Sequence, residues 1–87
     1  MVMNKRRFSR LSLEEKTKWI YFNGELVTSI RYYAYKVNLY LIAGFYVELF
    51  YHHSHDKIER VDFLDEHSKR MNFYADQVRL PSDLSLS

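Results

Sequence analysis

The sequence predicts a single α+β domain in which a four-stranded antiparallel meander lies between two helices, in the order α-β-β-β-β-α. Residues 37–51 alternate between apolar and polar side chains on both sides of Ala43-Gly44, which is typical of a β-hairpin. A helix start signal precedes this hairpin at Ser12, and apolar residues at helical spacing follow Asp65. Helices that flank an antiparallel sheet in this way define the α+β class.

The length of 87 residues limits the chain to one small domain with a thin core. We expect residues 1–10 to be a flexible basic arm, residues 11–80 to fold, and residues 81–87 to form a loose tail. Because the sequence has no cysteine, disulfides and thiolate metal sites are excluded, and we expect a cytoplasmic protein. We expect no signal peptide and no membrane-spanning segment, since no apolar run is long enough for either.

The N-terminal helix is predicted to run from Leu13 to about Asn23. Ser12 and Glu15 have the spacing of a capping box, in which each side chain binds the backbone amide of the other residue. Gly24 marks the end of this helix. The residues that we expect to face the sheet are Leu13, Ile20 and either Trp19 or Phe22.

The central hairpin should pair so that aliphatic side chains lie together on one face of the sheet. This condition places Leu39 opposite Leu49 and Leu41 opposite Val47. On the other face, the same register pairs Tyr40 with Glu48 and Asn38 with Phe50.

The two outer strands are predicted on either side of this hairpin. Residues 25–33 fit a helix or a strand by spacing, but the β-branched Val27, Thr28 and Ile30 favour a strand. Residues 53–57 form a polar loop, and residues 58–64 form the last strand. Its expected pairs are Val61 with Leu49 and Phe63 with Val47.

The C-terminal helix is predicted from Glu66 to about Val78, with Asp65 as its N-cap and Pro81 preventing its extension. Its apolar stripe consists of Met71, Tyr74, Ala75 and Val78. We expect both helices to pack on the sheet face that carries Leu39, Val47 and Leu49.

The opposite face of the sheet is then left for a partner. It mixes aromatic and charged side chains, and an apolar patch with a charged rim is typical of an interaction site. Glu48 and Asp62 would lie side by side there, neutralised by Arg60 and Lys36. The predicted interaction face consists of Tyr40, Ile42, Tyr46, Glu48, Phe50, Arg60 and Asp62. We expect a small non-enzymatic assembly module that forms a homodimer, or binds another protein, through this face.

Charge supplies the alternative function. Residues 1–44 contain eight Lys/Arg and three Asp/Glu, whereas residues 45–87 contain five Lys/Arg and eight Asp/Glu. A basic first half can attract an anionic partner. The alternative is therefore a nucleic-acid-associated protein, in which bases stack on the aromatic face. The anion contacts in this case are Lys5, Arg6, Arg7 and Arg10.

A metal site has one candidate segment, the loop His52-His53-Ser54-His55-Asp56, because neutral imidazoles bind zinc or nickel. His53, His55 and Asp56 are its candidate ligands, although a polar hairpin loop without metal is the expectation. The sequence has no glycine-rich phosphate loop, no GxSxG and no HExxH. We therefore expect no catalytic residues, no enzyme activity and no cofactor.

Residues 24–53, GELVTSIRYYAYKVNLYLIAGFYVELFYHH, together with Ile58, Val61 and the segment FYADQVRL, resemble small uncharacterised conserved bacterial proteins. The resemblance covers most of the chain. It implies the order helix, four-stranded meander, helix, and it implies no activity.

Overall fold

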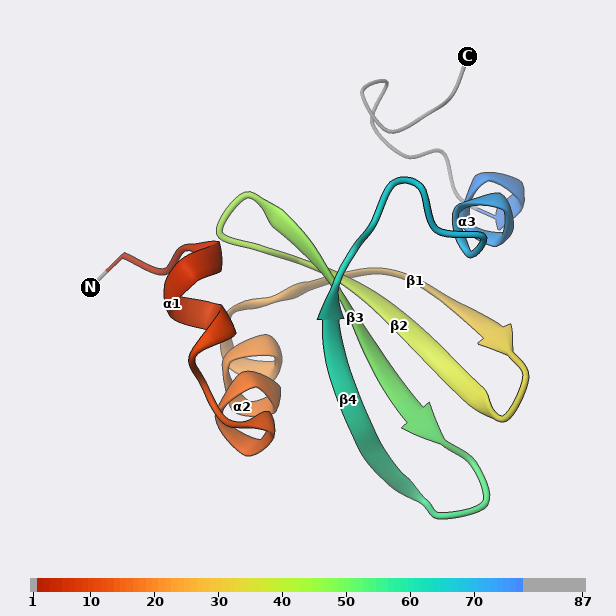
Figure 1. Cartoon of the computed structure of the whole chain (residues 1–87), viewed down its shortest axis with the longest axis horizontal. Helices are drawn as coiled ribbons and strands as arrows, with labels where there is room; N and C mark the ends of the chain where they lie inside the picture. The colour runs from red at the N-terminus through yellow and green to blue at the C-terminus, as the bar shows by residue number, and fades with distance from the viewer. Residues whose placement is uncertain (1, 78–87) are drawn as a thin grey trace.

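The computed structural model describes residues 2–77 and confirms the predicted α+β architecture (Figure 1). One four-stranded antiparallel sheet has the strand order β1-β2-β3-β4, and helices precede and follow it. The elements are α1 (Lys5–Ser9), α2 (Leu13–Asn23), β1 (Glu25–Tyr32), β2 (Tyr35–Ile42), β3 (Phe45–His52), β4 (Lys57–Phe63) and α3 (Met71–Gln77).

The turn between β2 and β3 lies at Ala43-Gly44, as predicted. Both residues have positive φ, 48° and 85°, which is the geometry of a two-residue type I′ turn. Such a turn places Ile42 directly opposite Phe45, and this is the observed pairing. Gly44 suits this position because it has no Cβ to oppose a left-handed backbone.

The predicted register of this hairpin is wrong by one residue. Leu39 lies opposite Glu48 instead of Leu49, and Tyr40 lies opposite Val47. The prediction matched aliphatic side chains, but that register leaves a single residue at the turn. The two-residue turn requires the other register, and every side chain of β2 therefore moves to a different row.

The outer strands follow the predictions more closely. Residues 25–32 form β1, so the choice of strand over helix for this segment is confirmed. Val61 pairs with Leu49 and Phe63 pairs with Val47, as predicted. An irregularity in the pairing of β3 with β4 lies between Phe50 and Tyr51, opposite Glu59.

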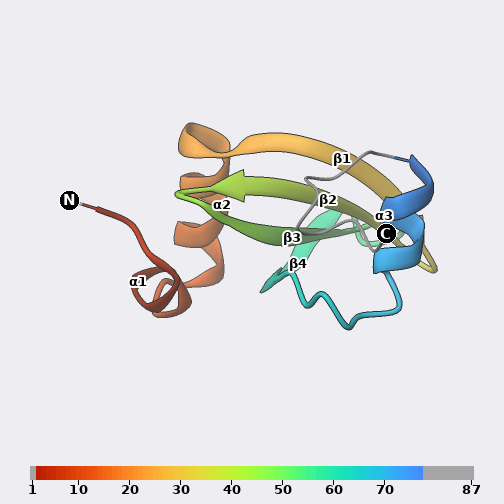
Figure 2. The ribbon, with the colours of Figure 1, turned by 90° about the horizontal axis from the view of Figure 1, so that it is seen from above.

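Helices cover both faces of the sheet, which corrects the expectation that both would pack on one face. The N-terminal face, made of Ile42, Val47, Leu49 and Val61, packs against α1 and α2. The C-terminal face, made of Ile30, Val37, Leu39 and Phe50, packs against α3. In Figure 2, α1 and α2 lie at one end of the molecule and α3 at the other.

The first ten residues do not form the expected free arm. Asn4 caps α1 by accepting a hydrogen bond from the Arg7 amide at 2.9 Å. Met3 and Phe8 are buried in the N-terminal core, and the Phe8 ring contacts Phe45 edge-on at 5.7 Å. The prediction rested on the basic, polar composition of a chain terminus, whereas Met3 and Phe8 gain free energy from burial.

Helix α2 begins at the predicted capping box. The Glu15 amide donates to the Ser12 hydroxyl, and the Ser12 amide donates to the Glu15 carboxylate. Ile20 is fully buried and Trp19 packs beside it, but Leu13 and Phe22 are exposed. Only part of the expected inward face is therefore correct, because a short helix that crosses a sheet buries a narrow stripe.

Helix α3 is shorter than predicted, since residues 66–70 form turns. Met71 and Tyr74 are buried as expected, whereas Ala75 is exposed. Val78, Pro81 and the predicted tail at 81–87 lie outside the described residues. Within the described part of the chain, no helix is long and apolar enough to cross a membrane.

Candidate functional site

The residues of the predicted interaction face do not share one open surface. Tyr40 and Ile42 lie on the N-terminal face of the sheet, and Ile42 is buried. Glu48 and Phe50 are fully buried on the C-terminal face, where Tyr46 packs beside them. Arg60 and Asp62 are exposed and form an ion pair at 3.0 Å. The shifted register and the position of α3 together separate the set.

Glu48 is the one buried charged residue in the described chain. Arg70 donates two hydrogen bonds of 2.8 Å to its two carboxylate oxygens, and the Tyr74 hydroxyl donates a third of 2.7 Å. These bonds raise the pKa of the Arg70 guanidinium. Burial, followed by the adjacent Glu48 charge, raises the pKa of Tyr74. The network therefore connects β3 to the start of α3.

The predicted pair of carboxylates is present, and each carboxylate is paired with a cation of its own. Glu48 lies directly opposite Asp62, as expected. Arg70 forms an ion pair with Glu48, and Arg60 forms one with Asp62. Lys36 lies opposite Tyr51 of β3, one residue away from its expected position. Glu48 has no solvent-accessible surface in this structure.

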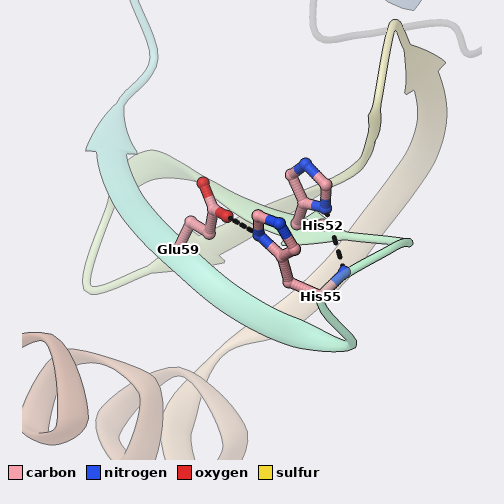
Figure 3. A group of neighbouring side chains, drawn as sticks. All are labelled: His52, His55 and Glu59. Carbon is pink, nitrogen blue, oxygen red and sulfur yellow. Dashed lines mark hydrogen bonds and ion pairs between the residues drawn. The ribbon is translucent and has the colours of Figure 1, made fainter.

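A cluster of three potential metal ligands lies at the β3–β4 hairpin: His52, His55 and Glu59 (Figure 3). One donor atom from each lies within 4.8 Å of the others. His55 Nδ1 is 2.9 Å from Glu59 Oε2, and the His52 and His55 rings stack with centroids 4.0 Å apart. The backbone amide of His55 also donates to His52 Nδ1 at 3.2 Å.

The backbone explains why these side chains meet. Phe50 pairs with Arg60 and Tyr51 with Ile58, so Glu59 is the extra residue of a β-bulge. A bulge redirects a side chain, and Glu59 meets His55 at the hairpin instead of continuing the alternation of the strand (Figure 3). The Tyr35 hydroxyl donates to Glu59 Oε1 at 3.0 Å. Hydrogen bonds from His55, first, and from Tyr35 lower the pKa of the Glu59 carboxyl.

Of the three ligands expected from the loop sequence, only His55 belongs to this cluster. The His53 ring contacts Tyr51, and Asp56 accepts a hydrogen bond from the Tyr51 hydroxyl. His52 and Glu59 were missed as ligands. The sequence shows two histidines three residues apart, His52 and His55. It does not show the β-bulge that brings Glu59 to them.

The predicted anion contacts lie on and just after α1. Lys5, Arg6, Arg7 and Arg10 are all exposed. The Lys5 ammonium lies 5.7 Å from the centre of the Phe63 ring. The aromatic face that would accompany them in nucleic-acid binding is covered by α3.

The two end strands of the sheet differ in their exposed side chains. On β4 three charged residues are exposed: Lys57, Arg60 and Asp62. Along β1 the exposed charged residues are Glu25 and Arg31, near its two ends. Exposed apolar residues lie at the same ends, with Leu26 54% exposed at its start and Tyr33 87% exposed just after its end. Phe73 of α3, which is 43% exposed, lies next to Tyr32 at the same end.

Comparisons with protein-family models, with curated proteins and with solved structures find no match. The resemblance to small conserved bacterial proteins therefore stays a prediction, and function must be argued from the geometry.

Proposed function

We propose that the chain is a small non-enzymatic assembly module of the cytoplasm that forms a homodimer through the edge of β1. The observation that carries this proposal is the gathering of exposed apolar side chains at both ends of that edge. This is the homodimer expected from the sequence, but its interface is an edge of the sheet instead of a face.

An end strand presents backbone N–H and C=O groups to which another strand can pair, and natural sheets protect such edges with charge. The charges along β4 give that strand this protection. The middle of β1, residues 27–30, contains no charged residue. This contrast favours β1 as the edge that accepts a partner strand.

A second copy is complementary to the β1 edge. Twofold antiparallel pairing brings the start of one β1 next to the end of the other. Leu26 of one copy then lies at the same end of the shared edge as Tyr33 and Phe73 of its partner, so exposed apolar residues gather at each end. Glu25 likewise approaches Arg31, so opposite charges meet across the axis. The result is a continuous eight-stranded sheet.

Light scattering coupled to size-exclusion chromatography tests this proposal. We expect the unmodified chain to elute with the mass of a dimer and Leu26→Lys to elute as a monomer. Arg31→Glu should weaken the dimer because like charges then meet. The double variant Glu25→Arg/Arg31→Glu should restore it, since the opposite charges are only exchanged.

Leu13→Lys is the matched control, because Leu13 is an exposed apolar residue at the far end of α2. It should leave the dimer intact. A monomeric unmodified chain at micromolar concentration contradicts the proposal. So does an unchanged dimer in Leu26→Lys.

The alternative function, nucleic-acid association, is supported by the four exposed cations at 5–10. Phosphate contacts release counterions, so binding through them depends strongly on salt. Retention on heparin and on single-stranded DNA should then decrease between low and moderate salt. The variant Arg6→Glu/Arg7→Glu should abolish it, and retention that does not respond to salt excludes this function.

A further inference from the structure

We propose that His52, His55 and Glu59 form a binding site for one late first-row divalent cation, with zinc, nickel and copper as the ions that fit. The site is independent of the β1 edge, since it lies at the β3–β4 hairpin. These ions prefer ligands of intermediate softness, such as two imidazoles and one carboxylate. Magnesium and calcium instead prefer sites made only of oxygen ligands.

The distances are close to those of a three-ligand site. Tetrahedral zinc with bonds of 2.0–2.2 Å holds its ligand atoms about 3.4 Å apart. His55 Nδ1 and Glu59 Oε2 are already 2.9 Å apart, so a cation can replace the proton that they share. All three donor atoms lie within 4.8 Å of one another, and the two imidazole rings stack with centroids 4.0 Å apart. Because a cation lies in the plane of each imidazole that binds it, the His52 ring must turn out of this stack to complete the set.

The surroundings of the cluster hold the ligands in position. The Tyr35 hydroxyl binds Glu59 Oε1 and leaves Oε2 facing His55. Hydrogen bonds of this kind, from groups behind the ligands, orient metal sites and increase their affinity. The Tyr35 ring also contacts the His52 ring edge-on at 5.2 Å. One tyrosine thus supports two of the three ligands.

The site is partly open to solvent. The side chain of His55 is 59% exposed and that of Glu59 is 26% exposed. Water can therefore occupy the remaining position of the cation, and the cation exchanges with solvent. Binding through His52 Nδ1 would displace the hydrogen bond from the His55 amide, whereas binding through Nε2 would leave it in place.

Calorimetric titration of the full chain with zinc chloride, together with thermal unfolding, tests the site. We expect one zinc per chain and a rise in Tm of about 10 °C at a hundredfold excess of zinc over Kd. His52→Ala, His55→Ala and Glu59→Gln should each weaken zinc binding at least about tenfold. Magnesium at the same concentration should produce no shift.

The other two histidines of the chain provide matched controls. His53→Ala and His67→Ala should bind zinc as the unmodified chain does, because neither belongs to the cluster. Equal losses in His53→Ala and His52→Ala overturn the assignment. A stoichiometry of one zinc per two chains, or the absence of saturable binding, also overturns it.

Discussion

Glu48 carries a charge at a position without solvent access, and three hydrogen bonds from Arg70 and Tyr74 make this position tolerable. A buried charge is costly unless it is paired and hydrogen-bonded. The Arg70 guanidinium lies 5.1 Å from the centre of the Phe50 ring and 5.4 Å from that of Tyr32, which adds cation–π attraction. A few side chains thereby specify where α3 docks.

Arg70→Met should lower the free energy of unfolding by about 3 kcal/mol, because it leaves the Glu48 charge buried without a partner. Chemical denaturation measures this loss. The triple variant Glu48→Met/Arg70→Met/Tyr74→Phe removes every polar group of the network and should recover most of the loss.

Arg60→Met is the control, because Arg60 pairs with Asp62 at the surface and stacks on the same Phe50 ring. Its expected cost is about 1 kcal/mol. If Arg60→Met and Arg70→Met lower the free energy of unfolding equally, the buried network contributes no more to stability than the surface ion pair.

At this scale, the sequence shows Glu48 as a charge in an apolar strand and predicts its neighbour Asp62 correctly. It does not show the partner Arg70, which is 22 residues away. That pairing depends on how the 64–70 segment turns back over the sheet. For the same reason, the histidine loop is visible in the sequence while its third ligand, Glu59, is not.

At the scale of elements, the two glycines of the sequence act by different physical means. Gly44 occupies a left-handed turn position with φ of 85°, and a Cβ there would meet nothing within 4 Å. Gly24 ends α2 with an ordinary φ of −85°, but a Cβ there would lie 2.6 Å from the Ile20 carbonyl oxygen. One glycine is needed for conformation and the other for space.

Asparagine substitution separates these two requirements. Gly44→Asn should cost less than about 1 kcal/mol, since asparagine tolerates the left-handed region. Gly24→Asn should cost about 1–3 kcal/mol, because backbone atoms cannot move away from the new Cβ without strain. Urea unfolding of both variants measures the difference, and equal costs contradict this explanation.

The register of the hairpin shows what local patterns can and cannot predict. The position of the turn is readable from Ala43-Gly44. The choice between neighbouring registers was made from side-chain type, and it failed because the apolar residues of β2 and β3 serve two different cores. Turn geometry was the better guide, since it requires Ile42 opposite Phe45.

At the scale of the whole molecule, element order and type were predictable because capping, alternation and turn signals are local. The sequence did not predict that both sheet faces are covered. This depends on the face toward which the N-terminal and C-terminal segments turn. Nearly half of the residues, 47%, are hydrophobic, which is enough for a core on each face. Neither face of the sheet is therefore left open by the helices.

Alkaline pH should destabilise the fold. Tyr35, Tyr40, Tyr51 and Tyr74 all have a pKa raised above the ordinary value of 10.0, Tyr40 and Tyr74 chiefly by burial and the other two by hydrogen bonds to carboxylates. The folded state thus retains protons that the unfolded chain releases above pH 10. Stabilisation from these groups is complete below pH 10 and is lost as the pH rises.

Tyr74 alone should lower the free energy of unfolding by about 1.4 kcal/mol per pH unit above 10. Urea unfolding between pH 8 and 11 measures the slope, and Tyr74→Phe should reduce it. A stability that stays constant to pH 11 contradicts the raised pKa values.

The strand order of the sheet, β1-β2-β3-β4, is the order of synthesis, so each strand can pair as soon as its neighbour exists. Helix α3 comes last. A sheet without docked α3 would expose the Glu48 carboxylate on its apolar C-terminal face, and a charge at such a position opposes aggregation. In the folded chain, Arg70 pairs with that carboxylate and the charge has no access to water.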